Sequence, residues 1–310
     1  MIMQPKTALL PRKKSTLHEE GKGYEIFSVF NIIFLILAII CTFYPIYFVL
    51  AASFSNAAGL AANYGLLLLP IRPLSLTAYE LVFRNPLVLS GYLNTIIILL
   101  VGVSINMVMT LMGAYTISLK HSLLARPLAL FMLFTMYFSG GMIPAYINIK
   151  SFGLMDTLWA LIIPGAVSTY NLLIMRSAFA ALPESLYEAA YLDGASHLRI
   201  LSQIYIPLSS ATIAVLALYY AVGHWNSWFN ASLYISTTSK YPLQLVLRQI
   251  LILNENSELN STMTDNGEQA LYADLVKYAL IVVSTVPILI LYPFLQKFFV
   301  KGVMVGAVKG

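Results

Sequence analysis

Long apolar stretches separated by short polar segments dominate this chain. Several of them exceed the roughly 20 residues that an α-helix needs to cross a hydrocarbon core, and they are too long for core strands. The pattern predicts an all-α membrane protein with a six-span domain over residues 26–300, between a basic segment at 1–25 and a tail at 301–310. The expected spans lie at about 26–52, 89–119, 123–146, 158–179, 207–234 and 272–298.

The fourth expected span contains its own helix breaker, Pro164-Gly165. In lipid, a broken helix persists only where its freed backbone groups meet protein or a water-lined cavity. The break is therefore either a kink that lines a cavity or an ordinary packing kink. Tyr170 and Asn171 follow it, and intramembrane polar residues are candidates for a substrate path. Hydrogen bonding between helices accounts for a lone asparagine equally well.

The fifth expected span ends in a cluster of aromatic and amide side chains. Sugar rings stack on aromatic faces while their hydroxyl groups need donors and acceptors, so this composition is typical of a carbohydrate path. An aromatic belt at the membrane interface explains the same tryptophans without any ligand. The candidate path residues in this span are Tyr220, Trp225, Asn226 and Trp228.

A polar segment at 182–206 interrupts the apolar pattern. Pro183 and Glu184 are typical of a first helical turn, and Gly194 tolerates a left-handed exit from a helix. Ser196 can cap a second short helix, and Pro207 disfavours helical dihedrals in the residue before it. The segment is predicted to form two short helices with a bend at Gly194 and a boundary at Pro207.

Composition and charge support the membrane assignment. Hydrophobic residues make up 59% and charged residues 10% of the 310 residues, against about 25% charged in a typical soluble domain. The net charge of +5 fits membrane orientation, because twelve of the 18 Lys and Arg residues fall in the expected cytoplasmic pieces and six in the outer ones. The positive-inside rule then places both termini in the cytoplasm. The longest expected outer loop, 235–271, is also the most polar.

The polar segment also carries a family pattern. It contains Glu188-Ala-Ala-Tyr-Leu-Asp-Gly194-Ala195, followed by Ile204-Tyr-Ile-Pro207-Leu208. This pattern resembles the EAA loop of bacterial ABC-importer permeases, with Ile206 where leucine is usual before the proline. The resemblance implies coupling helices that dock on a separate ATPase subunit, with a role for seven residues: Glu188, Ala189, Ala190, Asp193, Gly194, Ala195 and Pro207.

Further motifs narrow the resemblance to one cargo class. Ser75-Leu-Thr-Ala-Tyr79, Asn85-Pro86, Asn94-Thr95 and the Trp225 region resemble sugar-importer permeases of the MalG-like class, and within it the LplC/YtcP type, although Ala78 replaces the usual asparagine. This implies a type I importer fold and alternating-access uptake of oligosaccharides in a bacterial cell membrane. The implied partners are a second homologous permease, an ATPase dimer, and a lipid-anchored or periplasmic sugar-binding protein, with no nucleic acid.

Motifs for independent chemistry are missing from the sequence. It has no G-x-x-x-x-G-K-[ST] phosphate loop, H-E-x-x-H metal helix or G-x-S-x-G elbow. We therefore expect no enzymatic activity, resident cofactor or metal, with ATP and Mg²⁺ bound by the partner ATPase. The alternatives are an ABC permease for peptides or amino acids, a secondary transporter, and a membrane-embedded enzyme. The last two would need intramembrane carboxylates or a convergent titratable set. Apart from Asp274, at the end of the sixth expected span, the acidic residues stay outside the expected spans, and these spans contain no convergent titratable set.

Overall fold

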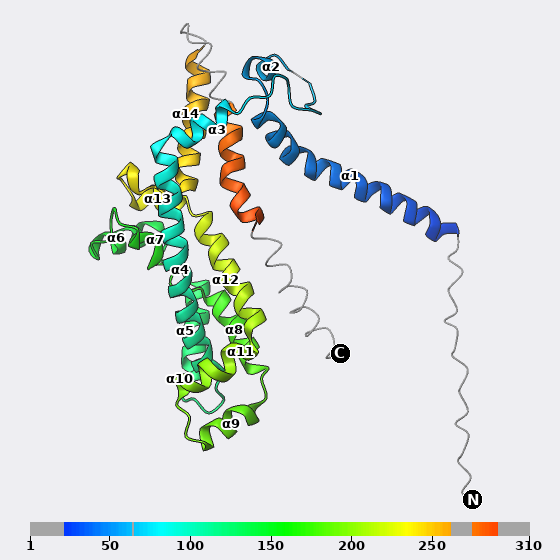
Figure 1. Ribbon diagram of the computed structural model, residues 1–310. Coiled ribbons are helices and arrows are strands. Elements are labelled where there is room, and N and C mark those ends of the chain that lie inside the picture. Colours follow the sequence, from blue (N-terminus) through cyan, green and yellow to red (C-terminus); the bar gives the residue numbers. More distant parts are fainter. Residues whose placement is uncertain (1–21, 64, 262–274, 291–310) are drawn as a thin grey trace, which may run out of the picture. The chain divides into compact units, whose positions relative to one another are not determined.

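The computed structural model describes residues 22–63, 65–261 and 275–290, and these residues form helices joined by turns, with no strand among them (Figure 1). Three sequence-based expectations lie outside the described residues, wholly or in part. They are the basic segment 1–25 except its last residues, the polar stretch from 262 to 271, and the tail 301–310. The expected sixth span, 272–298, is described over Leu275–Ile290, which is an apolar helix.

The chain divides into two units, residues 1–48 and 49–310. The first unit consists, in its described part, of most of helix α1 (Lys22–Ser53). Its residues Ile26–Ser53 are long and apolar enough to cross a membrane, which matches the expected first span at 26–52.

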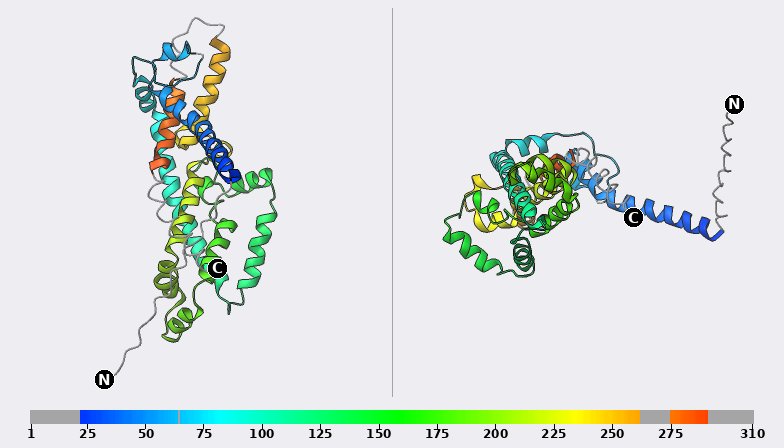
Figure 2. Two further views of the ribbon diagram at one scale, coloured as in Figure 1. Left: turned by 90° about the vertical axis from the view of Figure 1, so that its right-hand side faces the viewer. Right: turned by 90° about the horizontal axis from the view of Figure 1, so that it is seen from below.

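The second unit is organised around helix α4 (Pro86–Ser118). Asn85 starts this helix, because its side chain accepts a hydrogen bond from Leu87 N at 2.9 Å and Pro86 occupies the first turn, where a missing N–H is tolerated. Helices α8 (Thr169–Ala180), α12 (Ser210–Trp225) and α14 (Leu243–Ser261) all contact α4. The views in Figures 1 and 2 agree in placing α12 alongside it.

Helix α4 is the second of two described helices that are individually long and apolar enough to span a membrane, a number that rises to four if each of two bent pairs is one span. The first bent pair is α5 (Ala125–Tyr137) with α6 (Met142–Ser151), at 116°. The expected third span at 123–146 is therefore not one straight helix. Gly141, with φ of +89°, allows the turn because it has no Cβ.

The second bent pair joins residues His197–Leu208 to α12 at 88°. The expected fifth span, 207–234, also divides at its other end, because α12 stops at Trp225 and a separate helix α13 (Phe229–Tyr234) follows. The first break lies two residues after Pro207, the expected boundary, whereas the second falls at Asn226-Ser-Trp228, which contains no glycine or proline.

The expected fourth span, 158–179, consists of two helices rather than one kinked helix. Helix α7 (Trp159–Ile162) ends before the turn that contains Pro164-Gly165, and Ser168 caps α8 by accepting from Asn171 N. The carbonyl oxygens of Gly165 and Ala166 accept hydrogen bonds from Asn106 Nδ2 at 2.6 and 3.0 Å. Because these freed groups have protein partners, the contacts favour a packing kink over a cavity-lining one.

Shorter elements complete the described fold. They are α2 (Ala57–Ala61), α3 (Thr77–Arg84), which matches the sequence motif region before α4, and the 3₁₀ turn η2 (Thr238–Lys240). The expected outer loop 235–271 is not simply a loop, since α14 occupies much of it. Leu243 and Val246 are fully buried against Gly91 of α4, where the missing side chain permits close approach.

Three buried clusters hold the second unit together. One joins α3, α4, α14 and the helix Leu275–Ile290, and another joins α4, α7, α13 and α14. The third lies at the opposite end of α4 and contains Ala114, Tyr115, Ile117, Leu172, Met175, Phe179, Ile200, Leu201, Tyr205 and Leu216. This last cluster supports the polar segment that the sequence singles out.

Candidate functional site

Helix α9 (Glu184–Leu192) ends in a Schellman motif, as the sequence suggests. Gly194 has φ of +76°, and its N–H donates to Tyr191 O at 3.0 Å. The N–H of Ala195 donates to Ala190 O, also at 3.0 Å, and both alanines pack against the buried cluster. The small residues and the glycine of the EAA pattern are therefore those that the reversal requires, and the predicted bend at Gly194 is confirmed.

The second half of the segment begins as a short helix, as predicted, but this helix does not end where the sequence predicts. Ser196 caps α10 (His197–Ile200) by accepting from Arg199 N. A π-helix, η1 (Leu201–Tyr205), and α11 (Ile206–Leu208) then continue past the expected boundary at Pro207. Pro207 therefore lies within a helical stretch that runs from His197 to Leu208, and the bend falls two residues later, at the buried Ser209.

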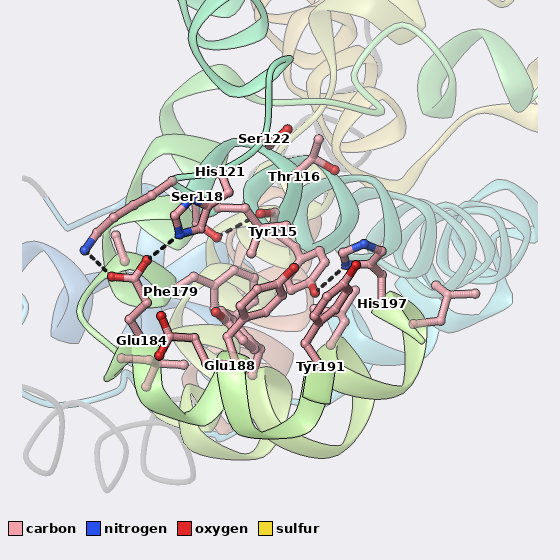
Figure 3. A pocket seen from close by; sticks show the side chains of 18 of the residues that line it. Tyr115, Thr116, Ser118, His121, Ser122, Phe179, Glu184, Glu188, Tyr191 and His197 are labelled. Carbon is pink, nitrogen blue, oxygen red and sulfur yellow. Dashed lines mark hydrogen bonds and ion pairs between the residues drawn. The ribbon is translucent and has the colours of Figure 1, made fainter. Parts of the chain in front are cut away.

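An aromatic cluster connects α9 and α10 to α4. Tyr115, near the end of α4, is buried, and its hydroxyl lies 3.1 Å from His197 Nδ1 (Figure 3). Its ring also meets the Tyr205 ring edge-on, with centroids 5.0 Å apart. On the other side, His197 stacks on Tyr187 of α9 at 6.2 Å. The contacts link both short helices to the same end of α4.

Charged groups occupy the opposite edge of this surface. Lys120, just after α4, donates to Glu184 Oε2 at 2.5 Å, and His121 Nε2 lies 3.3 Å from Glu184 Oε1. Hydrogen bonding to the Lys120 ammonium lowers the pKa of Glu184, and the same bond raises the pKa of Lys120. Figure 3 shows Glu188 beside Glu184 on the same edge. Glu188 is exposed, as are Ala189, Asp193 and Gly194.

A pocket of about 950 Å³ lies between these two edges. It is bounded by α9, α10, the end of α4 and the turn at 119–122, so its wall is partly aromatic and partly charged. Potential metal ligands of His121, Glu184 and Glu188 fall within 4.8 Å of one another there. Because Lys120 already neutralises Glu184, the contacts describe an ion-pair cluster.

The candidate path residues do not all face the same environment. Trp225 is buried and donates from Nε1 to Ser284 O at 3.2 Å, while the Tyr220 hydroxyl pairs with Thr110 Oγ1 at 2.7 Å. Asn171 is buried, whereas Tyr170 and Asn226 are exposed. Tyr220 and Trp225 therefore have structural roles within this chain, whatever else they contact.

Trp228 differs from the other path candidates because a charged guanidinium group covers one face of its ring. The guanidinium carbon of Arg248 lies 3.5 Å from the indole centroid. That face cannot also stack on a sugar ring.

A polar network in the apolar part of α4 was not predicted from the sequence. Asn106 is buried, and besides its bonds to the α7–α8 turn its Oδ1 lies 2.7 Å from His224 Nε2. Because an amide oxygen only accepts, His224 Nε2 must donate. A Cβ on Gly102 would lie 2.6 Å from that nitrogen, so this glycine makes room for the histidine. The available signal was the four-residue spacing of Gly102, Asn106 and Thr110, which places them on one helix face.

The fold and this surface together define a helical membrane protein with a polar element of two short helices. The model of the family described as "Binding-protein-dependent transport system inner membrane component" matches residues 123–305, and the chain belongs to this family. It is accordingly a membrane-embedded transport permease subunit.

Individual relatives agree with this assignment. The chain is 42% identical to Protein LplC of Bacillus subtilis over 296 residues, covering 95% of this chain and 98% of the relative. It is 38% identical to the polygalacturonan/rhamnogalacturonan transport system permease protein YtcP of the same organism, covering 89% and 95%. A chain from the crystal structure of a bacterial ABC transporter involved in the import of the acidic polysaccharide alginate superposes with a TM-score of 0.82 at 31% identity, covering 90% of this chain and 98% of that one.

Proposed function

We propose that this chain is one of two permease subunits of a bacterial ABC importer that takes up oligosaccharides by alternating access. The observation that carries the proposal is the α9–α10 pair, which presents the exposed Glu188 beside a helix reversal and is tied by Tyr115 to a helix long enough to span the membrane. Such a rigid connection converts a push on the short helices into movement of the membrane helices.

The carbohydrate cargo is supported by the relatives. YtcP is a polygalacturonan/rhamnogalacturonan permease by name, and the solved structural relative imports alginate. Both polymers are chains of sugars, and the relatives match this chain along most of its length rather than over one motif. A peptide or amino-acid cargo has no comparable support among these relatives.

The proposed assembly contains four kinds of component. This chain pairs with a second, homologous permease, an ATPase dimer binds both from the cytoplasm, and an extracellular sugar-binding protein delivers the cargo. ATP and Mg²⁺ are bound by the ATPase, because this sequence lacks a phosphate loop. The chain spans the cell membrane six times with both termini in the cytoplasm, and α9 and α10 are cytoplasmic coupling helices, in line with the distribution of its basic residues.

The site residues have two proposed roles. Glu188, Ala189, Ala190, Asp193, Gly194, Ala195 and Pro207 form or support the coupling element, with Glu188 as its charged contact to the ATPase. Among the path candidates, Tyr170 and Asn226 are exposed and are the most direct contacts for cargo, while Asn171, Tyr220 and Trp225 position the walls and Trp228 supports Arg248.

Reversing the charge at Glu188 tests the proposal. Glu188→Lys should reduce ATP-dependent oligosaccharide uptake at least tenfold and weaken copurification of the ATPase, because a buried like-charge contact is costly at an interface. The subunit should reach the membrane in normal amount, since Glu188 is exposed in the chain itself.

The matched control is Glu80→Lys on α3, which makes the same charge change at an exposed position far from the coupling helices in sequence. Uptake and ATPase copurification should be normal in this control. Normal uptake and normal copurification in the Glu188→Lys variant would show that α9 is not the docking element.

A further inference from the structure

The pairing of Arg248 with Trp228 joins two segments at the end of the second unit away from the coupling helices. Arg248 lies in the second turn of α14, and Trp228 directly precedes α13. The first turn of α14 is fixed to the start of α4, because Leu243 N donates to Thr95 Oγ1 at 2.9 Å. Tyr115 is a further 20 residues along α4, or roughly 30 Å at 1.5 Å per residue. Figure 1 shows α13 and α14 well separated from α9 along α4.

The indole of Trp228 is a fixed platform for the guanidinium. It is half-buried and packs against the cluster that contains Ile98 and Leu245, with Phe229 meeting its ring at 88° and 5.5 Å. Arg248 lies over its face at 3.5 Å. Stacking holds a guanidinium by its face and leaves the N–H donors in its plane available.

The charge of Arg248 is not neutralised by any residue that the structure describes. Lys240, the other basic residue of this region, donates to Asp156 Oδ2 at 2.9 Å and so is paired. Arg248 is exposed and has neither an ion pair nor a hydrogen bond to a described side chain or backbone group. An oriented, exposed guanidinium is suited to bidentate binding of a carboxylate.

We propose that Arg248, held on Trp228, binds a carboxylate of an acidic oligosaccharide as it enters the importer. The proposal rests on the oligosaccharide uptake proposed above and adds a substrate class, sugars that carry uronic-acid carboxylates. It also assigns a new role to Trp228, which orients the arginine instead of stacking on a sugar ring.

Comparing the uptake of an acidic oligosaccharide with that of its neutral ester distinguishes carboxylate binding by Arg248 from a general structural role of this residue. The complete importer, with both permeases, the ATPase and the binding protein, is reconstituted in liposomes and supplied with labelled trigalacturonate or its methyl ester. Arg248→Gln should reduce trigalacturonate uptake roughly tenfold, the value of a lost hydrogen-bonded charge contact, and leave methyl-ester uptake within about twofold of wild type. Arg248→Lys keeps the charge without the planar fork, and its loss should be intermediate.

The control is Arg84→Gln, which removes an exposed charge on α3 whose only described ion pair is a 3.9 Å contact with Glu80. Its uptake of both sugars should match wild type. Equal losses of acid and ester uptake in the Arg248→Gln variant would overturn the proposal, because they would show a structural role for Arg248. If the Arg248→Gln variant assembles poorly, the Arg248→Lys variant allows the same comparison. A wild-type importer that takes up neutral malto-oligosaccharide but not trigalacturonate contradicts this proposal alone. One that takes up no oligosaccharide contradicts the proposed function as well.

Discussion

At the scale of single residues, two glycines have the same left-handed backbone conformation but lie in different parts of the molecule. Gly194 and Gly153 both have positive φ, +76° and +67°, and a Cβ at either would meet no atom within 4 Å. Any effect of alanine at these positions therefore comes from backbone strain and not from a clash. Of these two glycines, only Gly194 lies in the proposed coupling element.

Alanine at Gly194 should therefore lower both stability and coupling. The left-handed conformation costs a residue with a Cβ about 1 kcal/mol, and relief of that strain would reorient α9 relative to α10. We expect a lower melting temperature of the purified complex and a several-fold drop in sugar uptake per ATP hydrolysed. Gly153→Ala should lower the melting temperature similarly without changing that ratio. Equal ratios in the two variants would mean that the bend at Gly194 has no mechanical role.

Residues whose role depends on a distant partner could not be predicted from the sequence. Gly194 and Ser196 act within their own turn, so their chemistry is visible in five or six letters. Asn106 contacts Gly165, 59 positions away, and His224, 118 positions away. Its apolar neighbours in α4 give no sign of either contact. The contacts that bury Trp225 could not be predicted for the same reason, because they involve Tyr92 and the backbone of Ser284 in a later helix.

At the scale of elements, hydropathy located the apolar helices better than it located their ends. Two expected spans correspond closely to helices α1 and α4, because uninterrupted apolar sequence leaves the backbone no partner but itself in lipid. Gly140-Gly141 and Pro207 lie beside the direction changes after α5 and before α12, but the sequence does not give the angles there, since these depend on how the helices pack. Helix α14 was hidden within a polar stretch because only Leu243, Leu245 and Val246 of its first turns are buried.

The Lys120–Glu184 ion pair joins the turn after α4 to helix α9, and its role can be tested by exchanging the two charges. Lys120→Glu should reduce coupled uptake roughly two- to fivefold, the range for an exposed ion pair, because it faces Glu184 with a like charge. Combining it with Glu184→Lys should restore most of the loss. Uptake is measured in the assembled importer, with subunit amounts checked by immunoblot. A double variant no better than the worse single variant would indicate that the pair does not position α9.

The same ion pair should be insensitive to pH over the physiological range. The lowered pKa of Glu184 means that its contribution is present above its ordinary value of 4.5 and lost as pH falls below it. The raised pKa of Lys120 means that its contribution is present below 10.5 and lost as pH rises above that value. The defect of Lys120→Glu relative to wild type should consequently remain constant between about pH 8 and 9. This window lies above the range in which histidine side chains ordinarily change charge, which matters because His121 also contacts Glu184.

At the scale of the whole molecule, the distribution of acidic residues separates an ATP-driven subunit from an ion-coupled transporter. A secondary transporter couples to protons or sodium through carboxylates within its membrane helices. Helices α4, α8 and α12 contain no Asp or Glu, and the buried threonine and asparagine side chains of α4, Thr95, Asn106 and Thr110, are neutral and already hydrogen-bonded. This distribution agrees with the proposal that energy for transport enters through α9 and α10 from a partner subunit.

The chain alone should accordingly show no ion-driven transport. Purified permease in liposomes, given an inward proton or sodium gradient and labelled trigalacturonate or maltotriose, should accumulate neither sugar above protein-free liposomes. Adding the second permease, the ATPase and the binding protein, with ATP inside the liposomes, should produce accumulation that disappears in the Glu188→Lys variant. Accumulation by the single chain that collapses when an ionophore dissipates the gradient would contradict this, because it would require a coupling carboxylate that the described membrane helices α4, α8 and α12 do not contain. ATP-dependent accumulation in the full assembly would then be a second, independent transport route. Transport by this chain would not require docking of an ATPase on α9.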